Sequence, residues 1–200
     1  GDQQCWFSGN TSGIFQVAVS GCKLRRSINV KTDKILSIAG TAGRKPHILG
    51  PYLAQTDTDL QSMPSGRLFT VRAGAHLVLH HLLLMRGKAC MVNNNRNCFG
   101  GFVYLNGAGA VLNASDCVFK GNDPYLKEES QMHAFYGGAV WAEGSARLFI
   151  RGVIFHHMRA NGGGAIYIQG STVHATIEAS TFESCSALLH YGGAINVQPG

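Results

Sequence analysis

The segment Tyr136-Gly137-Gly138-Ala139-Val140 sets the architecture of this chain, because copies of it return along the sequence. Gly163-Gly164-Ala165-Ile166 and Gly192-Gly193-Ala194-Ile195 repeat it, and Gly100-Gly101-Phe102-Val103 is a weaker copy upstream. The doublets begin at positions 100, 137, 163 and 192, and a phenylalanine follows the first three at 119, 155 and 182. The interval from doublet to phenylalanine is thus 19, 18 and 19 residues, whereas the doublets are 37, 26 and 29 residues apart. A constant unit with insertions of variable length is typical of a solenoid.

The units share columns of like residues when they are aligned on these phenylalanines, and a fourth unit falls into register on Leu84. The apolar columns seven and five positions before the anchor are Leu77, Leu112, Leu148 and Ala175, then Leu79, Ala114, Ile150 and Ile177. Mixed residues stand between them, and this alternation indicates strands with one buried face. An antiparallel sandwich would not repeat one residue class at one offset in four units. The pattern therefore predicts stacked coils of a parallel β-helix.

The pairing of Gly-Gly-Ala-[Ile/Leu/Val] with Phe-x-x-Asn resembles the repeats of chlamydial polymorphic outer-membrane proteins and related β-helix proteins of the pectin-lyase-like class. The doublets at 137, 163 and 192 match the first motif, and Phe119-Lys120-Gly121-Asn122 matches the second. Met158 and Cys185 stand where two other units would carry the Asn. The resemblance covers residues 67–197. It implies an all-β, right-handed, single-stranded parallel β-helix with five to six coils, and adhesion as the family's role.

We expect one domain over residues 1–200. Residues 1–26 are predicted to cap the first coil, since an open strand edge invites unwanted pairing. Coils follow over 27–122, beginning with Ile28 to Val30 and Ile35 to Ile38. Residues 123–136 are predicted to be a surface insertion, and 137–200 to form regular coils, the last of them incomplete.

Composition and charge disfavour two classes of partner. Charged residues make up only 14% of the chain, Gly accounts for 26 residues, and the net charge is +6. No apolar run is long enough to predict a membrane span. The basic cluster of Lys23, Arg25 and Arg26 is expected to be a solvated turn, because the extended basic stripe with aromatics that nucleic-acid binding requires is missing.

Six cysteines and two sequons favour an extracytoplasmic location: secreted, at the cell surface or in an organelle lumen. Disulfides are predicted for Cys5 with Cys22 and for Cys90 with Cys98, which lie in loops. Cys117 falls in an inward column and is expected to be a buried thiol, whereas Cys185 has no assigned partner. The candidate glycosylation sites are Asn10 and Asn113. No Cys-x-x-Cys pair supports a zinc site.

Neither a metal nor a cofactor is expected. The doublets His80-His81 and His156-His157 are the best candidates for metal ligands, but adjacent strand residues point to opposite faces. An enzyme acting on polysaccharides, a lyase or a glycoside hydrolase, is the alternative function that the family resemblance implies. Hydrolysis needs two carboxylates facing one groove. The available carboxylates stand in different columns, namely Asp116, Glu143, Glu178 and Glu183.

The column between the two apolar ones after each doublet carries Tyr104, Trp141 and Tyr167, followed by Asn196. Three aromatics on successive coils would make a flat stripe for a sugar ring or a protein partner. Alternatively, they stack on each other or lie beneath the 123–136 insertion. The sequence favours a non-catalytic interaction or structural module: a scaffold, an adhesin-like piece or an extrinsic subunit. We expect protein partners or further coils to cover the C-terminal edge of the solenoid.

Overall fold

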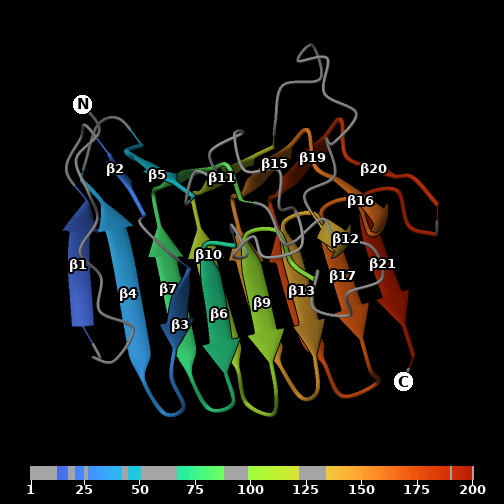
Figure 1. Cartoon of the computed structure of the whole chain (residues 1–200), viewed down its shortest axis with the longest axis horizontal. Helices are drawn as coiled ribbons and strands as arrows, with labels where there is room; N and C mark the ends of the chain where they lie inside the picture. Colours follow the sequence, from blue (N-terminus) through green and yellow to red (C-terminus); the bar gives the residue numbers. More distant parts are fainter. Residues whose placement is uncertain are drawn as a thin grey trace, which may run out of the picture.

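The chain is built from parallel strands. A computed structural model describes residues 13–17, 21–24, 27–41, 45–50, 67–87, 99–121, 134–189 and 191–199. These residues form 21 strands and no helix, so none of them crosses a membrane as a helix. All strand pairings are parallel, in three six-stranded sheets and one three-stranded sheet that run along the long axis of the molecule (Figure 1). The chain is therefore an all-β parallel β-helix, as the repeats predict.

Each coil passes through the sheets in a fixed order. Sheet 1, which follows the glycine doublets, contains β3 (Ile28–Val30), β6 (Phe69–Arg72), β9 (Val103–Asn106), β13 (Val140–Glu143), β17 (Ile166–Gln169) and β21 (Ile195–Gln198). Sheet 2 contains β1 (Gly13–Val17), β4 (Ile35–Gly40), β7 (His76–His80), β10 (Val111–Ser115), β14 (Arg147–Arg151) and β18 (His174–Glu178). Sheet 3, with the anchor phenylalanines, contains β2 (Cys22–Lys23), β5 (His47–Leu49), β8 (Leu83–Met85), β11 (Val118–Lys120), β15 (Ile154–His156) and β19 (Thr181–Glu183). Sheet 4 contains β12 (Ala134–Tyr136), β16 (Arg159–Gly162) and β20 (Ser186–Ala187).

The anchor residues of sheet 3 form a ladder inside the solenoid. Phe119 pairs with Leu84 on one side and with Phe155 on the other, and Phe155 pairs with Phe182. The rings of Phe119 and Phe155 stack with centroids 5.1 Å apart, and those of Phe155 and Phe182 stack at 4.8 Å. This spacing equals the distance between neighbouring strands, so each ring covers the next. The predicted ladder and its register are confirmed.

The connections that leave sheet 3 carry the variation in length. β5 is followed by β6 after residues 50–68, β8 by β9 after 86–102, and β11 by β12 after 121–133. By contrast, three residues connect β13 to β14 and two connect β14 to β15. The interval from doublet to phenylalanine spans only the short connections. For this reason it stays constant while the steps between doublets vary.

The two glycines of a doublet are needed for different reasons. Gly137 has a φ of +61°, and a Cβ there would lie 2.1 Å from the carbonyl oxygen of Val140. Gly138 lies against the next coil, where its Cβ would approach the carbonyl oxygen of Gly164 to 2.1 Å. The first glycine therefore permits a left-handed corner, and the second permits close stacking of successive coils.

A second corner turns on one residue of left-handed conformation between sheets 2 and 3. The residues at this position are His81, Asp116, Gly152 and Ala179, with φ of 55°, 52°, 63° and 46°. Non-glycine residues adopt this conformation at some cost, and Asp tolerates it better than most. Because the four residues share no chemistry, the sequence carries no recognisable signal for this corner.

Two predicted boundaries change. Residues 13–17 and 22–23 form β1 and β2, which pair in parallel with β4 and β5 and so add a partial coil ahead of the predicted first one. The remaining residues of the predicted 1–26 cap lie outside the described residues, apart from Gly21 and Leu24. The last three residues of the predicted insertion 123–136 form β12, which pairs with β16. Five full passages through sheets 1 to 3 begin at β3, β6, β9, β13 and β17.

Candidate functional site

The predicted aromatic column forms on the outer side of sheet 1. Trp141 pairs with Tyr104 on the preceding coil and with Tyr167 on the following coil. The rings of Trp141 and Tyr167 are parallel within 1°, with centroids 4.5 Å apart. Thr70 precedes this column and Asn196 ends it. The three aromatics therefore stack on successive coils, as their spacing predicts.

Two further aromatic rings cover this column. The Phe99 ring stacks on Trp141 with centroids 4.1 Å apart, and the Tyr136 ring lies 4.7 Å from that of Tyr167. Trp141 is consequently only 2% exposed and Tyr167 only 8%. These contacts agree with the alternative in which the aromatics stack on each other or lie beneath the 123–136 insertion, of which Tyr136 is the last residue. Ligand binding by Tyr104, Trp141 and Tyr167 stays a prediction, and it would require Phe99 and Tyr136 to move.

Polar groups hold the edge of the aromatic cluster in place. Glu143 accepts hydrogen bonds from the Tyr104 hydroxyl at 2.6 Å and from Trp141 Nε1 at 3.2 Å. Burial, followed by the hydrogen bond to Glu143, raises the pKa of Tyr104. Arg67 donates to the carbonyl oxygens of Gly100 at 3.0 Å and Phe99 at 2.6 Å, and its guanidinium carbon lies 4.8 Å from the Tyr104 ring centre.

Arg67 is a buried cation in this cluster. Burial lowers its pKa to about 10, so it remains charged at neutral pH. Its position over the Tyr104 ring is a cation–π contact, and its carbonyl partners lie on the strand-entry segment of the next coil. The side chain thus ties two coils together. Sequence reasoning missed both Arg67 and Phe99. Arg67 has no counterpart in the other coils, whereas Phe99 carries a usable signal, since an aromatic residue also precedes the doublets at 137 and 192.

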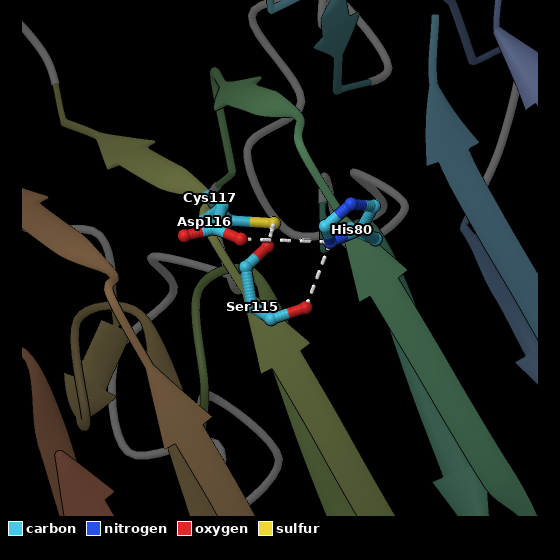
Figure 2. Close-up of polar contacts among 4 residues, drawn as sticks. All are labelled: His80, Ser115, Asp116 and Cys117. Atoms are coloured by element: carbon cyan, nitrogen blue, oxygen red, sulfur yellow. Dashed lines mark hydrogen bonds and ion pairs between the residues drawn. The ribbon is translucent and has the colours of Figure 1, made fainter. Parts of the chain in front are cut away.

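A polar cluster at the corner between sheets 2 and 3 combines the side chains of a hydrolytic triad without its geometry (Figure 2). His80 Nδ1 lies 2.9 Å from the Ser115 hydroxyl oxygen and 3.9 Å from Asp116 Oδ2. The thiol of Cys117 donates to the Ser115 carbonyl oxygen at 3.2 Å. A triad places its serine and its acid on opposite nitrogens of the imidazole. Here both contact Nδ1, so His80 has no route to pass a proton between them.

The two histidine doublets do not point to opposite faces of a strand, as the sequence predicts. His81 and His157 have positive φ at corners, so the strict alternation of a strand does not apply to them. The neighbouring rings come together instead, with centroids 3.9 Å apart for His156 and His157 and 6.1 Å for the other doublet. His156 also lies 3.7 Å from Glu183. Among the described residues, no three His, Cys, Asp or Glu side chains are arranged to hold a metal ion.

The candidate catalytic carboxylates are distributed over the molecule. Glu143 lies in sheet 1, Glu178 at the end of sheet 2 and Glu183 in sheet 3, whereas Asp116 occupies a corner between sheets 2 and 3. Glu143 is engaged by two aromatic side chains and Glu183 by a histidine. Asp116 and Glu178 therefore adjoin the same corner two coils apart, whereas Glu143 and Glu183 lie on other sheets.

The described cysteines comprise one bonded residue and two free thiols. Cys22 is disulfide-bonded, whereas Cys117 and Cys185 are free, so the partner of Cys22 lies outside the described residues. Both predicted pairings include residues outside them and stay predictions, as does glycosylation of Asn10. Cys117 is buried as expected, and burial raises its pKa to about 11. Asn113 is exposed on the outer face of sheet 2, where a glycan would fit.

The last coil carries the main apolar surface of the described chain. Of seven exposed large hydrophobic residues, four lie there: Leu188, Leu189, Tyr191 and Val197, with exposed fractions of 43%, 73%, 82% and 63%. We call these four residues the C-terminal face. Next to them, the inward side chains of the last coil are only partly buried against the core, including Ile177, Phe182 and Ile195. The interior ladders are thus open to solvent at this end.

Comparison with models of known protein families, with curated proteins and with solved structures finds no match in any of the three. The fold itself therefore defines the class of protein, a parallel β-helix.

Proposed function

We propose that this chain is a non-catalytic interaction module whose C-terminal face is covered by a protein partner or by further coils. It would serve as a scaffold, an adhesin-like piece or an extrinsic subunit of a larger assembly. The resemblance to polymorphic outer-membrane protein repeats fits this role. The six cysteines, the two sequons and the bonded Cys22 fit an extracytoplasmic location.

The observation that carries the proposal is the concentration of exposed apolar side chains on the last coil. Single exposed hydrophobic residues need no explanation, but a contiguous group marks a contact site in many soluble proteins. Here Val197 belongs to β21, and β18, β19 and β21 of the same coil are the edge strands of three described sheets. Strand edges present backbone donors and acceptors to an incoming chain. Apolar contact and strand pairing are thus available in one place.

Polysaccharide cleavage is the weaker candidate. Glycoside hydrolysis requires two carboxylates on either side of one scissile bond. Glu143, Glu178 and Glu183 lie on three different sheets, and two of them are already engaged by neighbouring side chains. A binding role for the aromatic column is also less favoured, since Trp141 is almost fully covered.

Site-specific photo-crosslinking in the native cells tests the proposal. A benzoylphenylalanine replaces Leu189 on the C-terminal face or, as a matched control, Phe149, which is 44% exposed on the outer face of sheet 2. We expect the probe at 189 to give one discrete crosslinked product and the probe at 149 to give none. Failure of the 189 probe to crosslink in cells, or equal labelling from both positions, contradicts docking through this face. Release of oligosaccharides from an anionic polysaccharide by the pure chain would favour the enzyme.

A further inference from the structure

The outer face of sheet 2 carries the exposed large hydrophobic residues that do not belong to the C-terminal face. Among the described residues these are Ile14, Ile35 and Phe149, with exposed fractions of 81%, 49% and 44%. Ile35 and Ser37 flank the buried Leu36 on β4, so both point away from the core. Ile14 pairs with Ser37, and Phe149 lies further along the same column on β14. All three hydrophobic side chains therefore share one face.

Basic side chains stand on both sides of this column. The outward positions beside it hold five exposed basic residues, namely His76, His80, Arg147, Arg151 and His174. The described strands of sheet 2 place one acid among these positions, Glu178, and Asp116 stands at the corner after β10. The outer face of sheet 2 thus combines cations with exposed hydrophobic side chains.

The charge of this face depends on pH. Near neutral pH the two arginines are balanced by Asp116 and Glu178. Histidine gains a positive charge as the pH falls through about 6.5. In acid, the histidines therefore turn a balanced face into a basic one.

The surroundings of His76 and His174 leave their positive charge available. The backbone N–H of His76 donates to the carbonyl oxygen of Lys34 at 2.8 Å, so Lys34 and its neighbour Asp33 are the charged residues beside it on the preceding coil. His174 pairs with Arg147 on β14. Neither histidine has an ion-pair partner within the part of the chain that the structure describes. An anion from outside the protein can therefore approach both.

His80 is compensated within the protein. Its Nδ1 lies 2.9 Å from the Ser115 hydroxyl oxygen and 3.9 Å from Asp116 Oδ2. The ring of His81 lies 6.1 Å away, and Lys45 is a further charged residue near this corner. The acid-dependent charge of the face therefore comes mainly from the other two histidines.

A flat, extended partner fits this arrangement. The six strands of sheet 2 lie side by side along the long axis of the molecule (Figure 1) and span about 24 Å at the usual strand spacing. The exposed hydrophobic residues are spread over this distance, from β1 to β14. Anionic membrane surfaces attract basic groups, and apolar side chains enter the boundary between headgroups and acyl chains. A polysaccharide or a nucleic acid offers no such layer to Ile14 and Ile35.

We propose that the outer face of sheet 2 is a membrane-docking surface that binds anionic lipid bilayers at acidic pH. The exposed hydrophobic side chains enter the interfacial layer, while Arg147, Arg151 and the protonated histidines contact the headgroups. The long axis of the solenoid then lies along the bilayer. This surface is separate from the C-terminal face, so both can be occupied at the same time.

Asn113 occupies the centre of the outer face of sheet 2. It is exposed, and it pairs with Val78 on one side and with Phe149 on the other. A glycan on Asn113 would hold the face away from a bilayer. Membrane docking therefore requires unmodified Asn113, and glycosylation at this position should abolish it.

Flotation with lipid vesicles tests the docking. The unglycosylated 200-residue chain, with the disulfide of Cys22 intact, is mixed with vesicles of equal parts phosphatidylserine and phosphatidylcholine, or of phosphatidylcholine alone. We expect binding to the anionic vesicles to be more than about tenfold tighter at about pH 5 than at about pH 7.5. The neutral vesicles should not bind the chain at either pH.

Matched variants assign the binding to this face. Arg147→Gln should weaken binding to anionic vesicles at about pH 5 by about fivefold, whereas Arg72→Gln, at an exposed position of sheet 1, should leave it unchanged. The double variant His76→Gln with His174→Gln should lose about tenfold at about pH 5 and nothing at about pH 7.5. Circular dichroism spectra like that of the wild type show that each variant is folded.

Three results would overturn membrane docking. They are equal binding of the wild type at both pH values, equal losses from Arg147→Gln and Arg72→Gln, and undiminished binding of a chain glycosylated at Asn113. Capture of the chain by soluble heparin without binding to vesicles would also overturn it and would identify a polyanion as the partner. Crosslinking from position 189 reports on a different surface, so its result and the vesicle result are independent. A lipid captured by the probe at position 149 is not a crosslinked protein.

Discussion

At the scale of single residues, stability depends on the ladder of anchors in sheet 3. Phe155 is fully buried between Phe119 and Phe182, with both neighbouring rings stacked on it. Phe149 lies on the preceding strand with its side chain on the opposite face and is 44% exposed. The two residues have the same chemistry in opposite environments, so they separate the contribution of burial from that of residue type.

Truncation of these two residues gives the first prediction. Phe155→Ala should lower the free energy of unfolding by about 3–5 kcal/mol, because it removes an aromatic ring from a ladder that cannot collapse around the cavity. Phe149→Ala should cost no more than about 1 kcal/mol, as is usual for exposed sites. Urea denaturation of both variants measures the difference. A larger loss from Phe149→Ala would mean that the strand register is shifted by one residue.

Cys117 makes stability depend on alkaline pH. Burial raises the pKa of its thiol from 9.0 to about 11, so above pH 9 the folded state holds a proton that the unfolded state releases. Stability therefore falls as the pH rises through this window. Cys117→Val, which copies the equivalent Val153, should remove this loss and gain about 1–2 kcal/mol relative to wild type between about pH 8 and about pH 10.5. Parallel pH dependence of the two proteins in denaturant titrations would contradict the assignment.

At the scale of elements, the doublet corners fix how closely the coils stack. Gly137 needs both a positive φ and an empty space where a Cβ would meet a carbonyl oxygen. Gly109 shares the positive φ, at +72°, but its nearest neighbour would lie 3.7 Å away. The pair of glycines therefore distinguishes backbone strain from steric exclusion.

Alanine substitution at these glycines gives the next prediction. Gly109→Ala should cost about 1–2 kcal/mol from the left-handed conformation alone. Gly137→Ala adds a clash with Val140 to the same strain and should cost about 3 kcal/mol or more. Thermal unfolding by circular dichroism measures both. Equal losses of stability in the two variants would show that the coil accommodates the added methyl group at position 137. The first glycine of the doublet would then be required only for its positive φ.

The elements themselves could be predicted from the sequence because their signal is periodic. The alternation of apolar residues and their fixed offsets predict sheets 1, 2 and 3, the anchor ladder and the aromatic column at Trp141. Sheet 4 lacked such a signal, since β12 and β16 lie in connections of variable length. The corners at His81 and Asp116 share only a backbone conformation, so no residue type marks them.

The cover of the aromatic column illustrates the same limit. Alternation places Trp141 on the outer side of its strand, but it does not tell what lies over that side. Phe99 and Tyr136 each directly precede a glycine doublet. The corner that the doublet forms places the aromatic ring of the preceding residue over the column. Such a contact depends on the path of the corner, which the sequence pattern left open.

At the scale of the whole molecule, the two ends of the solenoid differ in their surface. Ile28 and Val30 at the N-terminal end of sheet 1 are 5% and 2% exposed, whereas Val197 at the other end is 63% exposed. The apolar ladders are therefore open mainly at the C-terminal coil. Repeat proteins usually protect their terminal units with a polar outer face. The inward side chains of the last described coil are only partly buried, and this asymmetry underlies the proposed docking.

Amide hydrogen exchange of residues 186–198 tests this account most directly. It is measured in the isolated dilute chain and in the assembly purified from the native source, with β14 as an internal reference. We expect rapid exchange of those β21 amides that point away from β17 in the isolated chain, and strong protection of the same amides in the assembly. The amides of β14 should be protected in both samples. Equal exchange of β21 in the two samples would contradict docking through the C-terminal face.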